Sequence, residues 1–258
     1  MRTATLVLLL LPLGGCSLIG SLGDELSKYT ETTTMQGLAL NVAEPENDEV
    51  ANALAELPEW SPGIGRATIF LADAANVADL SNAPIRGAAV TLRAKSFGAL
   101  ALDEGDAGRY ETEDLDYPQG QELEVVIEGD TTHRASTIAP VGLKNLRLPE
   151  SSAMNRTIVV DASNEDIDAL LVVVVEVGTG KVIYDSTPTS VEDMYAFSHG
   201  DGPTRVELDG SLFDRAGLYA IGVSGLERAG EGTYEELNVL LSTFMAGEVV
   251  FHSVLIEG

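Results

Sequence analysis

Apolar residues along most of this chain occur in short runs or alternate with polar residues, the pattern typical of β-strands. In the first half, the pattern covers residues 35–42, 68–72, 84–92, 97–102, 106–110, 122–127 and 133–138. In the second half, it covers residues 157–160, 170–177, 181–185, 204–208, 214–223, 237–241 and 249–256. Short strands separated by Gly, Asp and Pro are typical of β-sandwiches. We therefore predict an all-β fold with two tandem sandwich domains, residues 34–148 and residues 149–258.

One short helix is predicted near residues 48–57 of the first domain. Its apolar residues share one helical face at spacings of three and four, namely Val50, Ala53, Leu54 and Leu57. Asn47 is a favourable N-cap, and Pro58 ends the helix. The following Trp60 is expected to pack a loop onto the domain, in preference to stacking on a ligand.

The run from residue 170 to residue 177 contains four consecutive valines, which indicates a strand buried on both faces. Gly178, Thr179 and Gly180 form a turn, and residues 181–185 return as the hairpin partner.

Residues 83–92 read Ala-Pro-Ile-Arg-Gly-Ala-Ala-Val-Thr-Leu, and Gly108-Arg109-Tyr110 follows them. These segments resemble the carboxypeptidase regulatory-like, transthyretin-like β-sandwich family. The resemblance implies a turn before a core strand and a tyrosine, Tyr110, that closes the end of the core. It also implies a non-catalytic accessory fold. The long segment 73–82 departs from the tight turn usual in that family.

The stretch 214–223 resembles the tyrosine-corner strand of immunoglobulin-like sandwiches. Tyr219, Ile221 and Val223 would share one face of that strand. The resemblance implies that the Tyr219 hydroxyl bonds to backbone upstream, and that the second domain is immunoglobulin-like.

The first sixteen residues carry an export signal. Arg2 precedes an apolar run over residues 4–13, too short for a membrane span of about 20 residues. Leu13-Gly14-Gly15-Cys16 resembles the lipobox of bacterial lipoproteins. The resemblance implies cleavage after residue 15 and diacylglycerol transfer to Cys16; an ordinary secretory signal is the alternative. Residues 16–33 would then be a lipidated, flexible tether.

The net charge of −26, with 41 acidic and 15 basic residues, argues against nucleic-acid partners, which need clustered Lys and Arg. Cys16 is the only cysteine, so the body forms no internal disulfide.

Candidate catalytic residues are few. His133, His199 and His252 are the only histidines, and the adjacent Ser198, His199 and Asp201 cannot stack as a triad. The best candidate calcium ligands are the acidic residues of one loop, Asp161, Glu165, Asp166 and Asp168, although turn capping explains them equally well. We therefore predict no catalytic residue, no cofactor and no metal site.

These observations predict a non-enzymatic envelope lipoprotein, held in a membrane by lipid on Cys16 and acting as a structural or binding module. Its loops would contact proteins or glycans. The alternatives are a calcium-dependent surface adhesin and a substrate-binding accessory of an envelope enzyme. Ser17 after Cys16 favours the outer membrane over the inner membrane, by resemblance to enteric lipoproteins.

Overall fold

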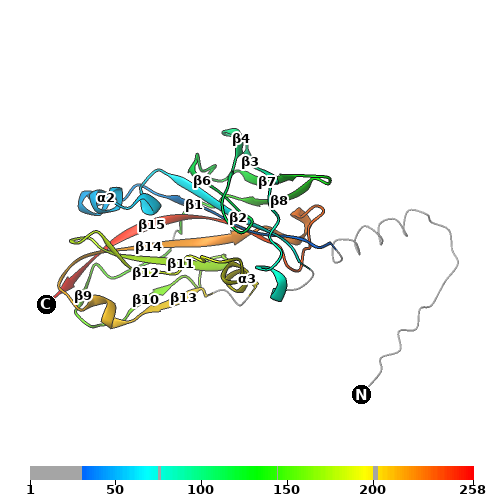
Figure 1. The fold of residues 1–258 in the computed structure, drawn as a ribbon. Coiled ribbons are helices and arrows are strands. Elements are labelled where there is room, and N and C mark those ends of the chain that lie inside the picture. Colours follow the sequence, from blue (N-terminus) through cyan, green and yellow to red (C-terminus); the bar gives the residue numbers. More distant parts are fainter. Residues whose placement is uncertain (1–30, 75–76, 144, 200–202) are drawn as a thin grey trace, which may run out of the picture.

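One long sheet runs through the whole body of the protein (Figure 1). The computed structural model describes residues 31–74, 77–143, 145–199 and 203–258. The strands of the long sheet follow the order β12-β11-β14-β15-β1-β2-β6-β5, and β9 also pairs with β15. In chain order they are β1 (Thr33–Val42), β2 (Gly65–Asp73), β5 (Asp103–Glu104), β6 (Arg109–Leu115), β9 (Ser151–Ala153), β11 (Ala169–Glu176), β12 (Lys181–Asp185), β14 (Gly217–Arg228) and β15 (Thr243–Glu257).

Two smaller sheets pack against the long one. The first has the order β4-β3-β7-β8 and consists of β3 (Ala89–Ala94), β4 (Gly98–Ala101), β7 (Glu122–Glu128) and β8 (His133–Ile138). The second pairs β10 (Ile158–Asp161) with β13 (Arg205–Leu208). The helices are α2 (Asp48–Ala55) and α3 (Val191–His199), with short 3-10 turns η1 (Pro58–Trp60), η2 (Val77–Asp79), η3 (Gly210–Phe213) and η4 (Glu231–Thr233). The small sheets lie at the top and bottom of Figure 1.

The last strand, β15, joins the two predicted domains. Its first half pairs in parallel with β1, from Gln36 opposite Thr243 to Val42 opposite Val249. Its length also pairs with β14. The long sheet therefore crosses the boundary between residues 148 and 149. That residues 34–148 and 149–258 fold as separate units stays a prediction.

Alternate side chains of β15 enter two different cores. Phe244 and Ala246 pack with the β4-β3-β7-β8 sheet, and Val254 and Ile256 pack with the β10-β13 sheet. Between these pairs the same alternate positions are Glu248, Val250 and His252. The buried Glu248 carboxylate accepts hydrogen bonds from three groups: Asn41 Nδ2 (3.1 Å), the Gly142 backbone N–H (2.9 Å) and Gln119 Nε2. Two polar side chains, Glu248 and His252, thus lie between the two cores, and three hydrogen bonds stabilise the buried Glu248 carboxylate.

The other set of β15 side chains enters a third core. Met245, Val249 and Phe251 pack with Val50 and Leu54 of α2, and Met194 of α3 joins them. The Asn47 side chain accepts from the backbone N–H of Glu49 (2.9 Å), as a helix N-cap does. The helix predicted near residues 48–57 is therefore confirmed, and its apolar face covers the long sheet.

The strand over residues 170–177 is confirmed as β11, buried on both faces. Leu170, Val172 and Val174 enter the core under β10-β13, while Leu171 and Val173 enter the core under the helices. The tyrosine corner is confirmed in its hydrogen bond, because Tyr219 Oη donates to the Arg215 carbonyl at 3.1 Å.

Two predictions are wrong. Residues 237–241 form turns and no strand. Asn238 Oδ1 accepts from the backbone N–H groups of Leu240 (3.0 Å) and Leu241 (3.2 Å), and this local bonding replaces a strand partner. The count of one helix is also wrong, because α3 is a second one. A serine precedes its first residue and caps it: Ser190 Oγ accepts a hydrogen bond from the Asp193 N–H at 3.0 Å.

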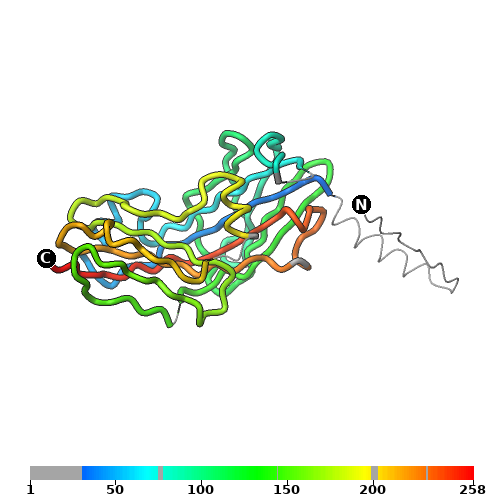
Figure 2. Tube along the Cα trace, turned by 90° about the horizontal axis from the view of Figure 1, so that it is seen from below, coloured from blue at the N-terminus to red at the C-terminus, as the bar shows by residue number. Residues whose placement is uncertain are grey.

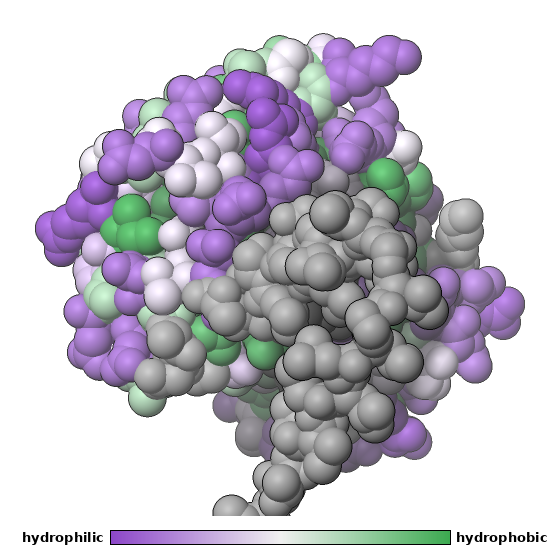
Figure 3. Space-filling view, turned by 90° about the vertical axis from the view of Figure 1, so that its right-hand side faces the viewer, coloured by the Kyte–Doolittle hydropathy of each residue, from purple (hydrophilic) through white to green (hydrophobic). Residues whose placement is uncertain are grey.

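The chain enters and leaves the body at opposite ends. β1 begins at one end, and the C-terminus lies at the other (Figures 1 and 2). At the end that Figure 3 faces, the visible described side chains are mainly hydrophilic, with apolar ones in small separate spots.

Candidate functional site

The predicted anchor lies outside the described residues. This applies to Cys16, to the signal over residues 1–15 and to most of the tether over residues 16–33. Within the described part of the chain, no helix is long and apolar enough to cross a membrane. The lipidation of Cys16 therefore stays a prediction.

The three histidines lie on three different elements. His133 on β8 contacts the Glu236 carbonyl through Nδ1. His199 is the last residue of α3, and Asp201 lies outside the described residues. His252 on β15 is half-buried; burial lowers its pKa, and nearby Glu46 opposes this change.

The acidic residues proposed as calcium ligands have separate partners. Asp161 Oδ1 accepts from the Ser163 N–H (3.0 Å), and Glu165 Oε1 accepts from the Asn145 N–H (2.8 Å). Asp168 Oδ2 accepts from the Arg228 N–H (2.8 Å). Burial is the main cause that raises the pKa of the Glu227 carboxyl, and the nearby carboxylates of Asp168 and Asp166 raise it further. Across the described ranges, no group of three or more His, Cys, Asp or Glu is placed to hold a metal ion.

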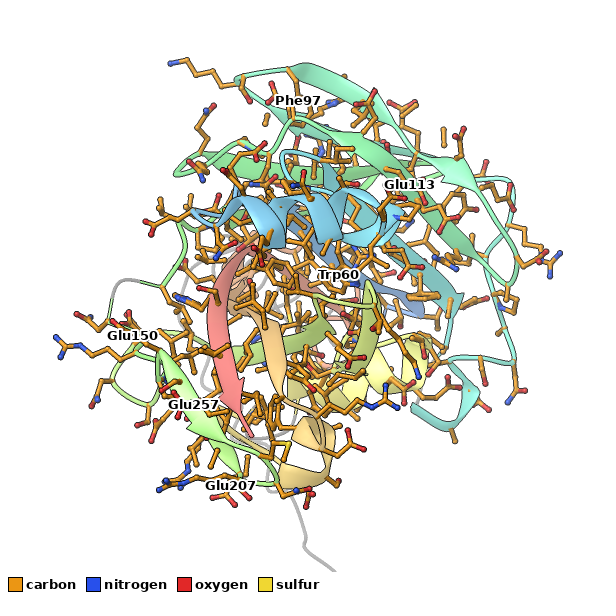
Figure 4. The ribbon with its side chains drawn as sticks, turned by 90° about the vertical axis from the view of Figure 1, so that its left-hand side faces the viewer. Trp60, Phe97, Glu113, Glu150, Glu207 and Glu257 are labelled. Atoms are coloured by element: carbon orange, nitrogen blue, oxygen red, sulfur yellow. The ribbon has the colours of Figure 1, made fainter. Side chains whose placement is uncertain are left out.

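Trp60 is a core residue, as the sequence predicts. It is 1% exposed and meets Phe251 edge-on, with ring centroids 6.2 Å apart. Figure 4 shows it in the interior, beneath α2. The Arg66 guanidinium lies over a Trp60 ring, 4.4 Å from its centre, in a cation–π contact.

Arg66 is one wall of a cavity of about 250 Å³. It belongs to β2, where it lies opposite Leu40 of β1, and Thr68 lies opposite Leu38. Arg109 of β6 lies opposite Phe70 of β2. Since alternate residues of a strand point to the same side, Arg66, Thr68 and Phe70 present one row to the cavity.

The facing wall comes from the second half of the chain. It consists of Asp185 at the end of β12, residues 187–189 that follow it, and Met194 of α3, while Glu59 of η1 closes one side. Asp185 Oδ1 accepts from the Thr187 N–H at 2.7 Å, which holds the start of this connection. The cavity therefore lies between segments that belong to different predicted domains.

The charged groups of the cavity differ in their pairing. Arg109 Nη2 lies 2.5 Å from Glu111 Oε2. The Arg66 guanidinium forms no hydrogen bond or ion pair with any residue that the structure describes, and it lies over the Trp60 ring. Burial lowers the pKa of the Arg66 guanidinium, and the more distant carboxylates of Glu59 and Asp185 oppose this change.

A hydroxyl group at the cavity also lacks a partner. Thr187 Oγ1 is buried, and no described atom forms a hydrogen bond with it. A buried polar group without a partner costs about 1–3 kcal/mol, so unpaired groups in one cavity indicate a place where a ligand or water can bind.

The sequence did not single out Arg66 or the residues that face it. The one feature of the sequence that bears on Arg66 is that basic residues are scarce, with 15 in the whole chain against 41 acidic ones. Nothing in the local pattern, however, tells an arginine at a cavity from one on the surface.

Comparison with protein-family models and with curated proteins finds no match. Among solved structures, the chain is similar to the FN1–FN3 domains of chicken CNTN1 at 10% identity and a TM-score of 0.25, covering 74% of this chain and 61% of that one. It is also similar to the Yersinia pseudotuberculosis adhesin InvE at 12% identity and a TM-score of 0.22, covering 88% and 59%. The chain spans less than two thirds of either structure. Overlap of this size assigns no activity, so function is argued from the side chains.

Proposed function

We propose that this protein is a non-enzymatic envelope lipoprotein, anchored in a membrane by lipid on Cys16, whose body binds a ligand. The observation that carries the binding role is the cavity that holds the unpaired Arg66 guanidinium. The anchor rests on the sequence Leu13-Gly14-Gly15-Cys16 and its resemblance to a lipobox.

The geometry of the body suits this role. β1 begins at one end of the body, and the C-terminus lies at the opposite end (Figure 1). A tether that enters at β1 would let the body extend away from the bilayer. The outer membrane is the proposed location, because Ser17 follows Cys16.

Metabolic labelling with a fatty-acid analogue tests the anchor. The full chain should take up label in its bacterial host, and the Cys16→Ala variant should take up none and leave the membrane fraction. Two or more acyl chains hold a protein stably in a bilayer, whereas one chain is marginal. Ser17→Ala is the matched control, because it changes the neighbouring residue and keeps the thiol. An unlabelled wild-type chain would refute the proposed anchor.

A further inference from the structure

We infer that the cavity around Arg66 binds a small zwitterionic ligand of the amino-acid type, with its carboxylate on the Arg66 guanidinium. This inference deepens the binding role proposed above and rests on it. It does not depend on the lipid anchor.

The carboxylate is indicated by the state of Arg66. Carboxylates pair with four of the described arginines, namely Arg93, Arg109, Arg134 and Arg205. The other described arginines apart from Arg66 have no carboxylate partner within the described part of the chain but are exposed to solvent, namely Arg86, Arg147, Arg156, Arg215 and Arg228, whereas Arg66 is half-buried. Arg66 instead rests on the Trp60 face and has no such partner among the described residues. A guanidinium that is stacked on an aromatic ring keeps its edge N–H groups available, and those groups match a carboxylate in a bidentate arrangement.

The zwitterion is indicated by the remaining charges. Glu59 and Asp185 line the same cavity as Arg66, so a ligand ammonium group would find carboxylates within it. A chain with a net charge of −26 repels a ligand that is itself negative overall, whereas a zwitterion carries no net charge.

The size and the apolar lining narrow the class further. A cavity of about 250 Å³ is smaller than the roughly 300–1,000 Å³ of drug-sized sites. Leu38, Leu40, Phe70 and Met194 contribute apolar surface to it. Thr187 lines the same cavity, and its buried hydroxyl has no hydrogen-bond partner among the described residues. These features fit one amino acid with an aliphatic side chain, and L-leucine is the probe that we choose.

Titration calorimetry of the full chain in detergent, with L-leucine as the probe, tests the inference. We expect saturable binding at one site, and leucinamide and 4-methylpentanoate should each bind at least 10-fold more weakly. Arg66→Gln should weaken leucine binding by about 10- to 100-fold, the loss expected for charge-assisted hydrogen bonds. Arg86→Gln is the matched control, because it removes the same charge from an exposed position outside the cavity and should bind like wild type.

Thr187→Val provides a second variant, for the case that Arg66→Gln does not fold. Its near-equal volume preserves the packing, and loss of the hydroxyl should weaken leucine binding by about 2- to 10-fold. Absence of leucine binding to the wild-type chain would overturn the inference. So would equal binding of leucinamide or of sulfate, or leucine affinity that neither cavity variant changes. The labelling experiment is scored separately, so binding without acylation would refute the anchor alone.

Discussion

Replacing the buried Leu92 with alanine should weaken the whole body at once. Leu92 lies on β3, is fully buried, and packs in the core that contains Phe244 and Ala246 of β15. A buried Leu→Ala change costs about 2–5 kcal/mol of unfolding free energy, with the larger losses where the cavity cannot collapse. Side chains of β15 also enter the other two cores, and its first half pairs with β1. Loss of the β4-β3-β7-β8 sheet would thus expose one face of β15 and weaken all three cores. We therefore expect one cooperative transition.

Urea unfolding followed by two probes measures this. Trp60 is the single tryptophan, and it reports the core beneath α2, which is not the core that Leu92 occupies. Far-UV circular dichroism reports the strands of the whole body. We expect both probes to give the same midpoint in the wild-type chain, and the same lowered midpoint in Leu92→Ala. Leu255→Ala is the control, because Leu255 is 47% exposed and its loss should change the free energy by no more than about 0.5 kcal/mol.

The reasoning fails if the two probes separate. Two transitions, or a Leu92→Ala variant in which circular dichroism shifts while Trp60 fluorescence does not, would mean that the halves unfold independently. That result would establish residues 34–148 and 149–258 as separate units despite the shared sheet.

Four further substitutions test single features through the stability of the folded chain. Tyr219→Phe should lower the free energy of unfolding by about 1 kcal/mol, because the Tyr219 hydroxyl makes one hydrogen bond. Tyr110→Phe should lower it by more, because the Tyr110 hydroxyl donates to one backbone group and accepts from another. A denaturation midpoint equal to that of the wild-type chain would contradict the prediction for either variant. Gly247→Ala should cost about 1–3 kcal/mol, since a Cβ there would lie 2.3 Å from two side-chain atoms of β14, and an unchanged midpoint would show that β14 can give way. Burial lowers the pKa of His252 below its ordinary 6.5, so the unfolded chain takes up this proton first and stability should fall as pH drops below about 6.5. His252→Asn should reduce that fall, and identical pH profiles for variant and wild type would refute it.

Local chemistry made much of the fold predictable. The helix near residues 48–57 was found because a cap, a spaced apolar face and a proline agree. Strand 133–138 matches β8 at both ends. The failures were local too. Helix α3 was missed although its Val191, Met194 and Tyr195 have helical spacing. Residues 237–241 were predicted as a strand because the apolar pattern does not reveal the hydrogen bonds that Asn238 makes. Of the residues that line the cavity, only Arg109 had been singled out, and for its place in a family motif. Trp60, which contacts Arg66, had been predicted only to pack a loop onto the domain.

The sequence by itself determined which side chains turn inward, because alternation along a strand depends only on backbone geometry. The Tyr219 hydrogen bond was expected from the resemblance to a tyrosine corner, and it joins residues close in sequence. The two hydrogen bonds of the Tyr110 hydroxyl were not predicted. Only the tertiary structure decided that β1 pairs in parallel with β15, about two hundred residues away. Every strand offers the same backbone N–H and C=O groups, so these groups do not specify which strand becomes the partner. The cavity around Arg66 depends on that pairing, since one wall comes from β1 and β2 and the other from the segment after β12.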